Sequence, residues 1–258
     1  AALMACRQEV SAIETAFSIY DPDSMLSHLN RDGKIKSDAR FSSLVRHALA
    51  MAETTGGAFD PTIQPLWRAF ATGADPVKAR RHIGWRGLLL DEGEVRFARP
   101  EMAASFNGIA QGFAADQVSA ILAQHGFEDT LVNLGEFAAR GTKRGGPWTL
   151  GIRAPSNGRI IARIKPVAGA IATSEPRSML VAGHPHIIDP LERAGERWLS
   201  VTVEASDAWR ADALSTAIAS SPIKQAESLL ASGGATRGWL ITGTGALHEW
   251  FANEKAYG

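Results

Sequence analysis

The sequence predicts a mixed α+β fold. Helical and strand-like segments alternate unevenly, without the regular β-α-β order of a doubly wound parallel sheet. The chain has 258 residues, of which 45% are hydrophobic and 21% charged, so it can bury a sizeable core in one large domain or two small ones. No stretch rich in Pro, Gly or Ser marks a boundary, so we expect a single domain over residues 1–258.

Apolar residues recur at spacings of three and four in the first part of the chain, a pattern typical of amphipathic helices. The first such series is Val10, Ile13, Phe17 and Tyr20. The turn at residues 21–24 ends this helix and provides a cap for the next. The further helices expected here cover residues 26–30, 41–52, which stops at Gly56-Gly57, and 66–70.

Strand-like segments dominate the rest of the chain. Strands are expected at residues 88–90, 94–97, 130–134, 148–153, 160–164, 168–172, 198–204, 239–241 and 247–251. Helices are expected at residues 114–124, 207–220 and 223–231, with Ser206 capping the second. Thr242 to Gly245 resembles a phosphate loop, but it lies between two strands with no helix after it, which favours a hairpin turn.

Composition excludes several classes of protein. Lys plus Arg and Asp plus Glu are 27 each, and zero net charge argues against broad nucleic-acid binding. No apolar run approaches the ~18 residues of a membrane-spanning helix. Cys6 is the single cysteine, which excludes an intrachain disulfide and a cysteine-based zinc site. The sequence starts at Ala1 without a Met or a basic, apolar leader, so we expect a processed form or a removed start.

The segment from Ser105 to Asp116 is the first candidate for chemistry. Gly108 and Gly112 lie where a strand is expected to pass into a helix. Glycine lets the backbone approach a ligand, and a helix start offers free amides to a phosphate. The alternative is a tight strand-to-helix turn with no ligand.

Asp212 and Thr216 are the second candidate, because residues four apart share one face of a helix. A carboxylate and a hydroxyl are hard oxygen donors that suit Mg²⁺, which takes its other ligands from water and phosphates. The alternatives are a solvated polar face, or a threonine that bonds back to its own helix.

His186 is the third candidate. A histidine in this position can serve as a general base near neutral pH. Alternatively, His184 and His186 could hold a metal from one strand, or His186 could be structural or exposed.

The segment Ala58-Phe59-Asp60-Pro61-Thr62 is a loop that could bind a ligand. Its alternative is a helix entry, with Asp60 or Thr62 as the cap and the proline at an early position. Tyr20 has two interpretations as well, a core residue or a ring that stacks on a ligand.

Together these stretches resemble the ApbE family, the FAD:protein FMN transferases. The matches follow family order over about residues 7–245: residues 17–24, 27–31, 55–62, 107–113, 132–135 (Val-Asn-Leu-Gly), 172–174 (Ala-Thr-Ser), 186–190 (His-Ile-Ile-Asp-Pro) and 211–217. The sequence Asn-Gly-Ile-Ala-Gln-Gly at residues 107–112 is most similar to the NosX branch of this family.

The resemblance implies a T-fold-like α+β architecture with FAD in a groove between the two halves of the chain. It implies that FAD is cleaved at its pyrophosphate, that FMN is transferred to a Ser or Thr hydroxyl of a target flavoprotein as a phosphoester, and that AMP leaves. Mg²⁺ is the implied cation, and bridging phosphates is a role that suits it. The acceptor implied by the NosX-like motif at residues 107–112 is a NosR-like membrane flavoprotein, and the implied location is periplasmic.

The resemblance also implies roles for individual residues. Metal ligands would be a backbone carbonyl near Gly108 with Asp212 and Thr216, and Ser215 would be at most a weak contributor. His186 would be the base that activates the hydroxyl. The implied FAD-contacting residues are Tyr20, Ala58, Phe59, Asp60, Ser105, Gln111, Ser174 and Ile188.

The chain departs from the family pattern at several positions. Gln111 stands where the family often has Lys, Ser105 where it often has Asp, and Glu175 where it usually has Gly. Residues 191–195 match the family's usual Thr-Gly ending only weakly, and the family's opening strand with its Met-Gly-Thr motif is not present. These departures motivate two alternatives, a FAD pyrophosphatase that releases FMN and AMP, and a flavin-binding or partner-docking module without turnover. An aromatic residue at Tyr20 favours transfer, because related hydrolases lack it.

Overall fold

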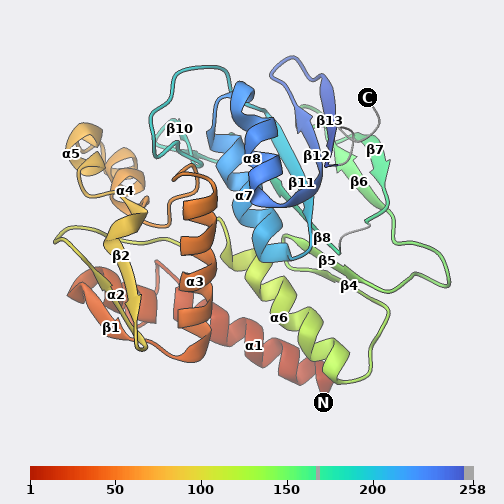
Figure 1. Ribbon diagram of the computed structural model, residues 1–258, viewed down its shortest axis with the longest axis horizontal. Coiled ribbons are helices and arrows are strands. Elements are labelled where there is room, and N and C mark those ends of the chain that lie inside the picture. Colours follow the sequence, from red (N-terminus) through yellow and green to blue (C-terminus); the bar gives the residue numbers. More distant parts are fainter. Residues whose placement is uncertain (167–168, 253–258) are drawn as a thin grey trace.

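A six-stranded antiparallel sheet forms the centre of the computed structural model, which describes residues 1–166 and 169–252 (Figure 1). Its strand order is β13-β12-β11-β8-β5-β4, and every neighbouring pair is antiparallel. The strands are β4 (Thr130–Asn133), β5 (Phe137–Arg140), β8 (Ala170–Ser174), β11 (Ser200–Ala205), β12 (Ala235–Ile241) and β13 (Leu247–Phe251).

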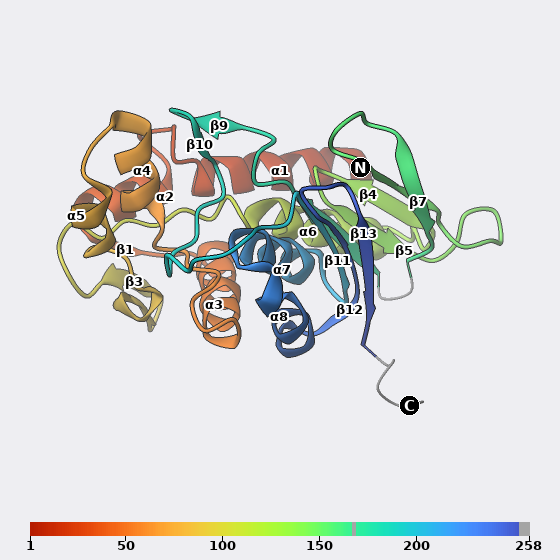
Figure 2. The same ribbon diagram turned by 90° about the horizontal axis from the view of Figure 1, so that it is seen from above.

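Both faces of this sheet are covered. Helices α6 (Ala110–Gln124), α7 (Ala208–Ser220) and α8 (Ala226–Gly233) lie on one face, as Figure 2 shows from above. On the other face, the hairpin of β6 (Leu150–Arg153) and β7 (Ile160–Ile164) packs its isoleucines against the sheet. The cluster that this hairpin forms with the sheet contains Ile152, Ile164, Ile171, Trp239 and Ile241. Covering both faces explains why β8 and β11 are buried almost throughout.

The first hundred residues form a second group of elements beside the sheet. A small sheet of order β1-β3-β2 packs with five helices there (Figure 1). These elements are α1 (Ala2–Phe17), α2 (Met25–Asp32), β1 (Lys34–Lys36), α3 (Ala39–Thr54), α4 (Gln64–Thr72), α5 (Pro76–Arg80), η1 (Trp85–Gly87), β2 (Leu88–Asp91) and β3 (Glu94–Phe97). Later in the chain, the short pair β9 (Leu180–Val181) and β10 (His184–Pro185) and the 3-10 turn η2 (Ile223–Gln225) complete the structure.

Aromatic rings join the two groups. Phe17 of α1 stacks on Phe41 of α3 with ring centroids 4.9 Å apart, and Phe106 meets both rings edge-on. Phe113 of α6 approaches Phe17 edge-on at 6.5 Å. Edge-to-face and offset contacts of this kind are the favoured arrangements of aromatic pairs. A single cluster of buried side chains therefore continues from the helical group into α6, α7 and the sheet.

Helices α6 and α7 touch at Gly112, where there is no room for a side chain. A Cβ atom at this position would lie 2.2 Å from the carbonyl oxygen of Ala208. Each helix also supplies a carboxylate to the amino end of the other. Asp212 accepts the Gly112 amide at 2.9 Å, and Asp116 accepts the amides of Ala208 and Trp209, both at 2.9 Å. Carboxylates at helix amino ends satisfy orphan amides and complement the helix dipole.

The predicted mixed α+β class is confirmed, and so are the expected hairpins, including the Thr242–Gly245 turn between β12 and β13. The helix predicted at residues 114–124 begins earlier, at Ala110. The strand predicted at residues 168–172 lies at Ala170–Ser174, and residue 168 is outside the described residues. None of the described helices is long and apolar enough to cross a membrane.

Three predictions were wrong in detail. The first helix ends at Phe17, because Ser18 is extended and its hydroxyl accepts the amides of Tyr20 and Asp21. Ser206 does not cap α7. Its hydroxyl donates to Asp207, the residue at the cap position, and the first amides of the helix are satisfied from α6 instead.

The third concerns the approach to α6. No strand passes directly into this helix, since β3 ends at Phe97 and residues 98–109 form a loop. The tight strand-to-helix turn is therefore absent from this position.

Gly112→Ala should destabilise the protein by about 1–3 kcal/mol, because overpacking at a contact without room outweighs the better helix propensity of alanine. Chemical denaturation would measure the change in the free energy of unfolding. Gly146→Ala is the matched control, since its Cβ would meet nothing closer than 3.7 Å. Equal stability of the two variants would contradict the close contact.

Asp116 should make stability depend on pH. Burial raises the pKa of its carboxyl to about 6, and the negative charge of Asp207 adds to this, while the two helix amides oppose it. An unfolded aspartate titrates near 4, so between about pH 4 and pH 6 the folded state holds a proton that the unfolded state has lost. This carboxyl therefore removes stability as the pH rises through that window, and its contribution is constant above it.

Asp116→Asn removes this titration. The unfolding free energy of the original protein, relative to that of the variant, should fall by about 1–3 kcal/mol from pH 4 to pH 6.5. Denaturation at several pH values would measure this. A difference that stays constant across this range would show that Asp116 titrates as an ordinary exposed aspartate.

Candidate functional site

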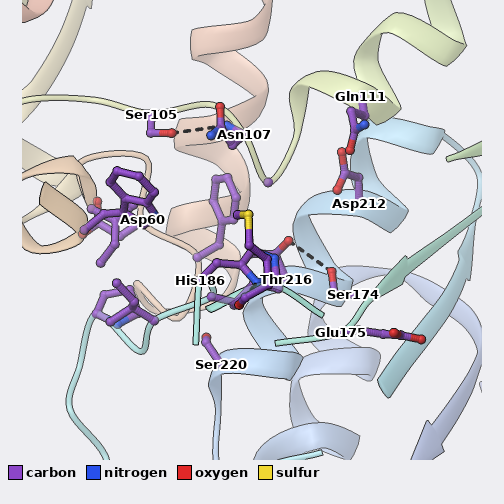
Figure 3. Close-up of a pocket in the computed structure, with 18 of the residues that line it drawn as sticks. Asp60, Ser105, Asn107, Gln111, Ser174, Glu175, His186, Asp212, Thr216 and Ser220 are labelled. Atoms are coloured by element: carbon purple, nitrogen blue, oxygen red, sulfur yellow. Dashed lines mark hydrogen bonds between the residues drawn. The ribbon is translucent and has the colours of Figure 1, made fainter. Parts of the chain in front are cut away.

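A cavity of about 440 Å³ opens between the two groups of elements, and every site residue predicted from the sequence lines it (Figure 3). The twelve residues are Tyr20, Ala58, Phe59, Asp60, Ser105, Gly108, Gln111, Ser174, His186, Ile188, Asp212 and Thr216. They come from both halves of the chain, as expected for a groove between the halves. We call this cavity the main pocket.

Asp212 and Thr216 present one face of α7 to the main pocket, as their spacing predicts. Asp212 is only 4% exposed, so the alternative of a solvated polar face is wrong. Thr216 does not bond back to its helix, because its hydroxyl lies 3.3 Å from that of Ser174. Ser215 makes the backward bond instead, to the Asp212 carbonyl at 2.9 Å. It is fully buried and does not line the pocket, so it is no metal-ligand candidate.

Gly108 lies directly against Thr216. A Cβ atom on this glycine would be 2.9 Å from the methyl carbon and 3.0 Å from the hydroxyl oxygen of Thr216. The backbone of the loop before α6 therefore approaches the polar face of α7 as only glycine allows. Gln111, in the first turn of α6, lies in the same way against Gly135, whose φ of +103° also requires glycine. These two contacts place the loop, α6 and α7 around one end of the pocket.

The Asp60 loop is rigid through its own hydrogen bonds. One carboxylate oxygen of Asp60 accepts the amide and the hydroxyl of Thr62 at 2.7 and 2.6 Å, and the other accepts the Trp85 amide at 3.0 Å. Neither residue caps α4, which starts at Gln64 after Ile63 with Pro65 in its first turn. Burial raises the pKa of Asp60, while the bonds from Thr62 and Trp85 lower it. The helix-entry interpretation is therefore wrong, and the loop is a fixed wall of the pocket.

Tyr20 and Ser105 lie at different depths. Tyr20 is 76% exposed at the pocket mouth, which excludes its interpretation as a core residue and leaves its ring free to stack on a ligand. Ser105 is buried, and its hydroxyl accepts the Asn107 amide at 3.4 Å (Figure 3). This bond supports the turn that leads to Gly108.

His186 is oriented by the backbone. Its Nδ1 and its amide both lie near the Met179 carbonyl, at 3.1 and 3.2 Å. A carbonyl can only accept a hydrogen bond, so Nδ1 carries the proton and Nε2 presents a lone pair. His184 lines a different cavity and packs on Phe70, with ring centroids 4.4 Å apart. The two histidines therefore do not form a metal site together.

Two carboxylates in the pocket were missed from the sequence. Glu136, directly after the Val-Asn-Leu-Gly match, is 8% exposed and accepts the Thr173 amide at 2.9 Å. An acidic residue between two apolar strands was the available signal. Glu175 was noted only as a departure from the family pattern, and it is half-buried in the pocket wall. Burial raises the pKa of both residues, and the nearby Asp212 charge raises that of Glu136 further.

The main pocket is acidic. It is lined by four carboxylate residues, Asp60, Glu136, Glu175 and Asp212, and by no Lys or Arg among the described residues. Burial also raises the pKa of Asp212, against the Gly112 amide that lowers it. Desolvated carboxylates of this kind favour a cation or a proton as partner. The carboxylate of Asp212 and the hydroxyl of Thr216 are oxygen donors of the kind Mg²⁺ prefers, so this end of the pocket fits the cation. No group of three or more His, Cys, Asp or Glu side chains suited to a metal occurs in the described part of the chain.

The sequence matches the ApbE family over residues 2–237. It is 27% identical to the FAD:protein FMN transferase of Treponema pallidum over 254 residues, which cover 80% of this chain and 70% of that protein. It is 26% identical to the FAD:protein FMN transferase of Haemophilus influenzae over 174 residues, 58% of this chain. The match spans about half the length of that relative, 50%.

Solved structures show the same fold. The crystal structure of the ApbE protein from Thermotoga maritima superposes with a TM-score of 0.85 at 28% identity, covering 96% of this chain and 88% of that one. The apo form of the flavinyl transferase ApbE from Pseudomonas stutzeri gives 0.85 at 25% identity, covering 98% and 85%. With a family match over nearly its whole length and this shared architecture, the chain belongs to the ApbE family.

Proposed function

We propose that the main pocket binds FAD and Mg²⁺ and transfers FMN to a Ser or Thr hydroxyl of a target flavoprotein. The observation that carries the proposal is one cavity that holds both a base and an oxygen-donor face. His186 presents a free Nε2, and Asp212 and Thr216 line the same space. Relatives of this chain bear the name FAD:protein FMN transferase, which agrees with this chemistry.

The acidity of the pocket supports a role for a divalent cation. A pyrophosphate carries negative charge, and the pocket is lined by four acidic residues and by no Lys or Arg among the described residues. When bound, Mg²⁺ would supply positive charge to offset the negative charge that develops as a phosphoryl group is transferred. Asp212 and Thr216 are the side chains that would hold it, together with backbone near Gly108.

His186 is the residue proposed to activate the acceptor. A hydroxyl is a poor nucleophile at neutral pH unless a base removes its proton. The proton would pass to Nε2 of His186 as the hydroxyl oxygen forms a bond to the phosphorus of the FMN half. The bond from that phosphorus to the bridging oxygen breaks, and AMP leaves with the electron pair. The Met179 carbonyl holds the imidazole in the tautomer that this step needs.

The remaining pocket residues are proposed to bind FAD. The wall of Ala58, Phe59 and Asp60 is preformed, which lowers the entropic cost of binding. Tyr20 at the mouth offers a ring face, and Ile188 an apolar contact. Ser105, Gln111 and Ser174 offer neutral hydrogen-bonding groups, which can orient FAD without neutralising its phosphates.

The acceptor and the location are proposed on the family resemblance. We propose a NosR-like membrane flavoprotein as the acceptor and the periplasm as the compartment. The alternatives are a pyrophosphatase, in which water takes the place of the protein hydroxyl, and a module that binds flavin without turnover.

The decisive experiment incubates the protein with FAD, Mg²⁺ and the flavin-carrying domain of a NosR-like protein. The intact mass of that domain should rise by one FMN less one water, and EDTA should prevent the gain. Free FMN and AMP without a labelled domain would favour the pyrophosphatase, and neither product would favour the module without turnover.

Asp212→Asn should reduce Mg²⁺-dependent transfer by roughly 10²-fold or more, because it removes the charge of the proposed ligand while keeping an oxygen for the Gly112 amide. Transfer rates at several Mg²⁺ concentrations would measure the loss. Asp75→Asn, at the exposed start of α5, is the control for loss of a charge. Unchanged Mg²⁺ dependence in Asp212→Asn would remove Asp212 from the metal site.

His186→Ala should slow transfer by roughly 10²–10⁴-fold, the usual contribution of a general base. FAD binding, followed by quenching of flavin fluorescence, should change little. His125→Ala, at the exposed position directly after the end of α6, is the control. A normal transfer rate in His186→Ala would exclude the proposed role.

A further inference from the structure

A second cleft, of about 820 Å³, adjoins the main pocket. Three residues, Ile187, Ile188 and Ser220, line both spaces. The floor and rim of the second cleft are formed by β10, the segment before β11, the end of α7 and the β12–β13 turn. Its apolar lining includes Phe70, Pro176, Pro185, Ile187, Trp198 and Ile223.

Two stretches of single chain separate the cleft from the main pocket. In residues 175–179, Glu175, Ser178 and Met179 line the main pocket, whereas Pro176 and Arg177 line the second cleft. In residues 184–188, His186 faces the main pocket, whereas His184 and Pro185 face the second cleft. The partition carries no helix, and it contains the proposed base. Because His186 stands in this partition, a chain held in the second cleft is separated from it by no more than single stretches of chain.

The chain directly after the partition, at residues 189–190, is held in place from both sides. On one side, the Arg80 side chain of α5 donates to the carbonyls of Asp189 and Pro190 at 3.4 and 3.3 Å. On the other, the Asp189 carboxylate accepts Arg193 at 2.8 Å and Arg197 at 3.2 Å. Because residues 189–190 follow directly on the partition, these bonds fix that end of the wall between the two spaces.

The charges and the apolar lining of the cleft point to a polypeptide ligand. Trp198 lines the cleft but is only 7% exposed, and its Nε1 is buried out of reach of a ligand. The exposed charges of Arg177 and Glu196 have no ion-pair partner in residues 1–166 and 169–252. Opposite charges at separate points would fix the direction of an extended chain. Aromatic and proline side chains supply the apolar contacts.

We propose that the second cleft binds an extended segment of the acceptor polypeptide and delivers its hydroxyl past the partition to His186. This inference rests on the proposed function and adds the surface that selects the acceptor. The modified residue has to be small and its neighbours extended to pass the segment at residues 184–188. A carboxylate on the acceptor would meet Arg177.

Gly243→Trp is the test variant. Gly243 lies in the exposed β12–β13 turn on the cleft rim, and a Cβ atom there would meet nothing within 4 Å. The indole should obstruct the cleft without disturbing the fold. Gly146→Trp, in a turn away from both spaces, is the matched control. Arg177→Glu is a second variant that reverses a charge on the cleft without adding bulk, and thermal unfolding of each variant would confirm that it is folded.

The assay measures transfer to the NosR-like domain, FAD binding, and slow FAD hydrolysis by water without the acceptor. We expect Gly243→Trp to lower kcat/KM for the domain at least tenfold, Arg177→Glu to raise its KM, and both to keep FAD binding and hydrolysis within twofold. Gly146→Trp should match the original protein.

Each result decides the proposal. Transfer at the original rate in both cleft variants would overturn it, and the proposed function would stand. Loss of FAD binding in Gly243→Trp would also overturn it, because the cleft would then belong to the nucleotide site. If the original protein neither transfers FMN nor cleaves FAD, the proposed function fails first and the inference falls with it.

Discussion

The contact between α6 and α7 at Gly112 is the constraint on which the rest of the structure depends. It brings the amino ends of two helices within hydrogen-bonding distance of each other's carboxylates, Asp116 and Asp212. A larger residue at position 112 would separate the helices and break both sets of bonds. The same contact carries the loop before α6 against α7, so that Gly108 meets Thr216. The candidate metal face thus exists because two helices pack without a side chain between them.

The position of Asp212 between the two helices has a desolvation cost. Asp212 is buried, and burial raises its pKa, yet the chain keeps a charged residue type there. A hydrophobic residue at position 212 would pack without that desolvation cost, but it would leave the Gly112 amide without its acceptor. Its second oxygen is not used by the Gly112 amide, and it lies on the pocket side of α7 (Figure 3). The energy lost by burying the carboxylate is of the kind that a bound cation returns.

Features that depend on neighbouring residues could be predicted from the sequence, whereas hydrogen bonds between distant segments could not. Spacing alone placed Asp212 and Thr216 on one face, and the ordered matches to the ApbE family gathered twelve residues that line one cavity. The cap of α7 was assigned to Ser206 because local sequence shows only neighbouring residues, whereas the true partner, Asp116, lies 92 residues away along the chain. Glu136 was missed for the same reason, since its partner amide belongs to Thr173, 37 residues further on. Contacts of this length follow from the order of strands in the sheet, which periodicity does not report.

Two departures from the family pattern change the charge of the pocket lining in the same direction. With Gln111 in place of the usual Lys, and with Glu175 added, the pocket loses a cation and gains a carboxylate. Both changes weaken direct electrostatic attraction for a phosphate and strengthen attraction for a metal ion. Arg177 is two residues from Glu175, and it faces the second cleft rather than the pocket. A carboxylate residue in the wall of the main pocket and a positive side chain in the second cleft thus come from one short stretch of chain, residues 175–177. In the proposed function, this arrangement would make FAD binding depend on the cation, and Arg177 would attract an acidic acceptor segment to the second cleft.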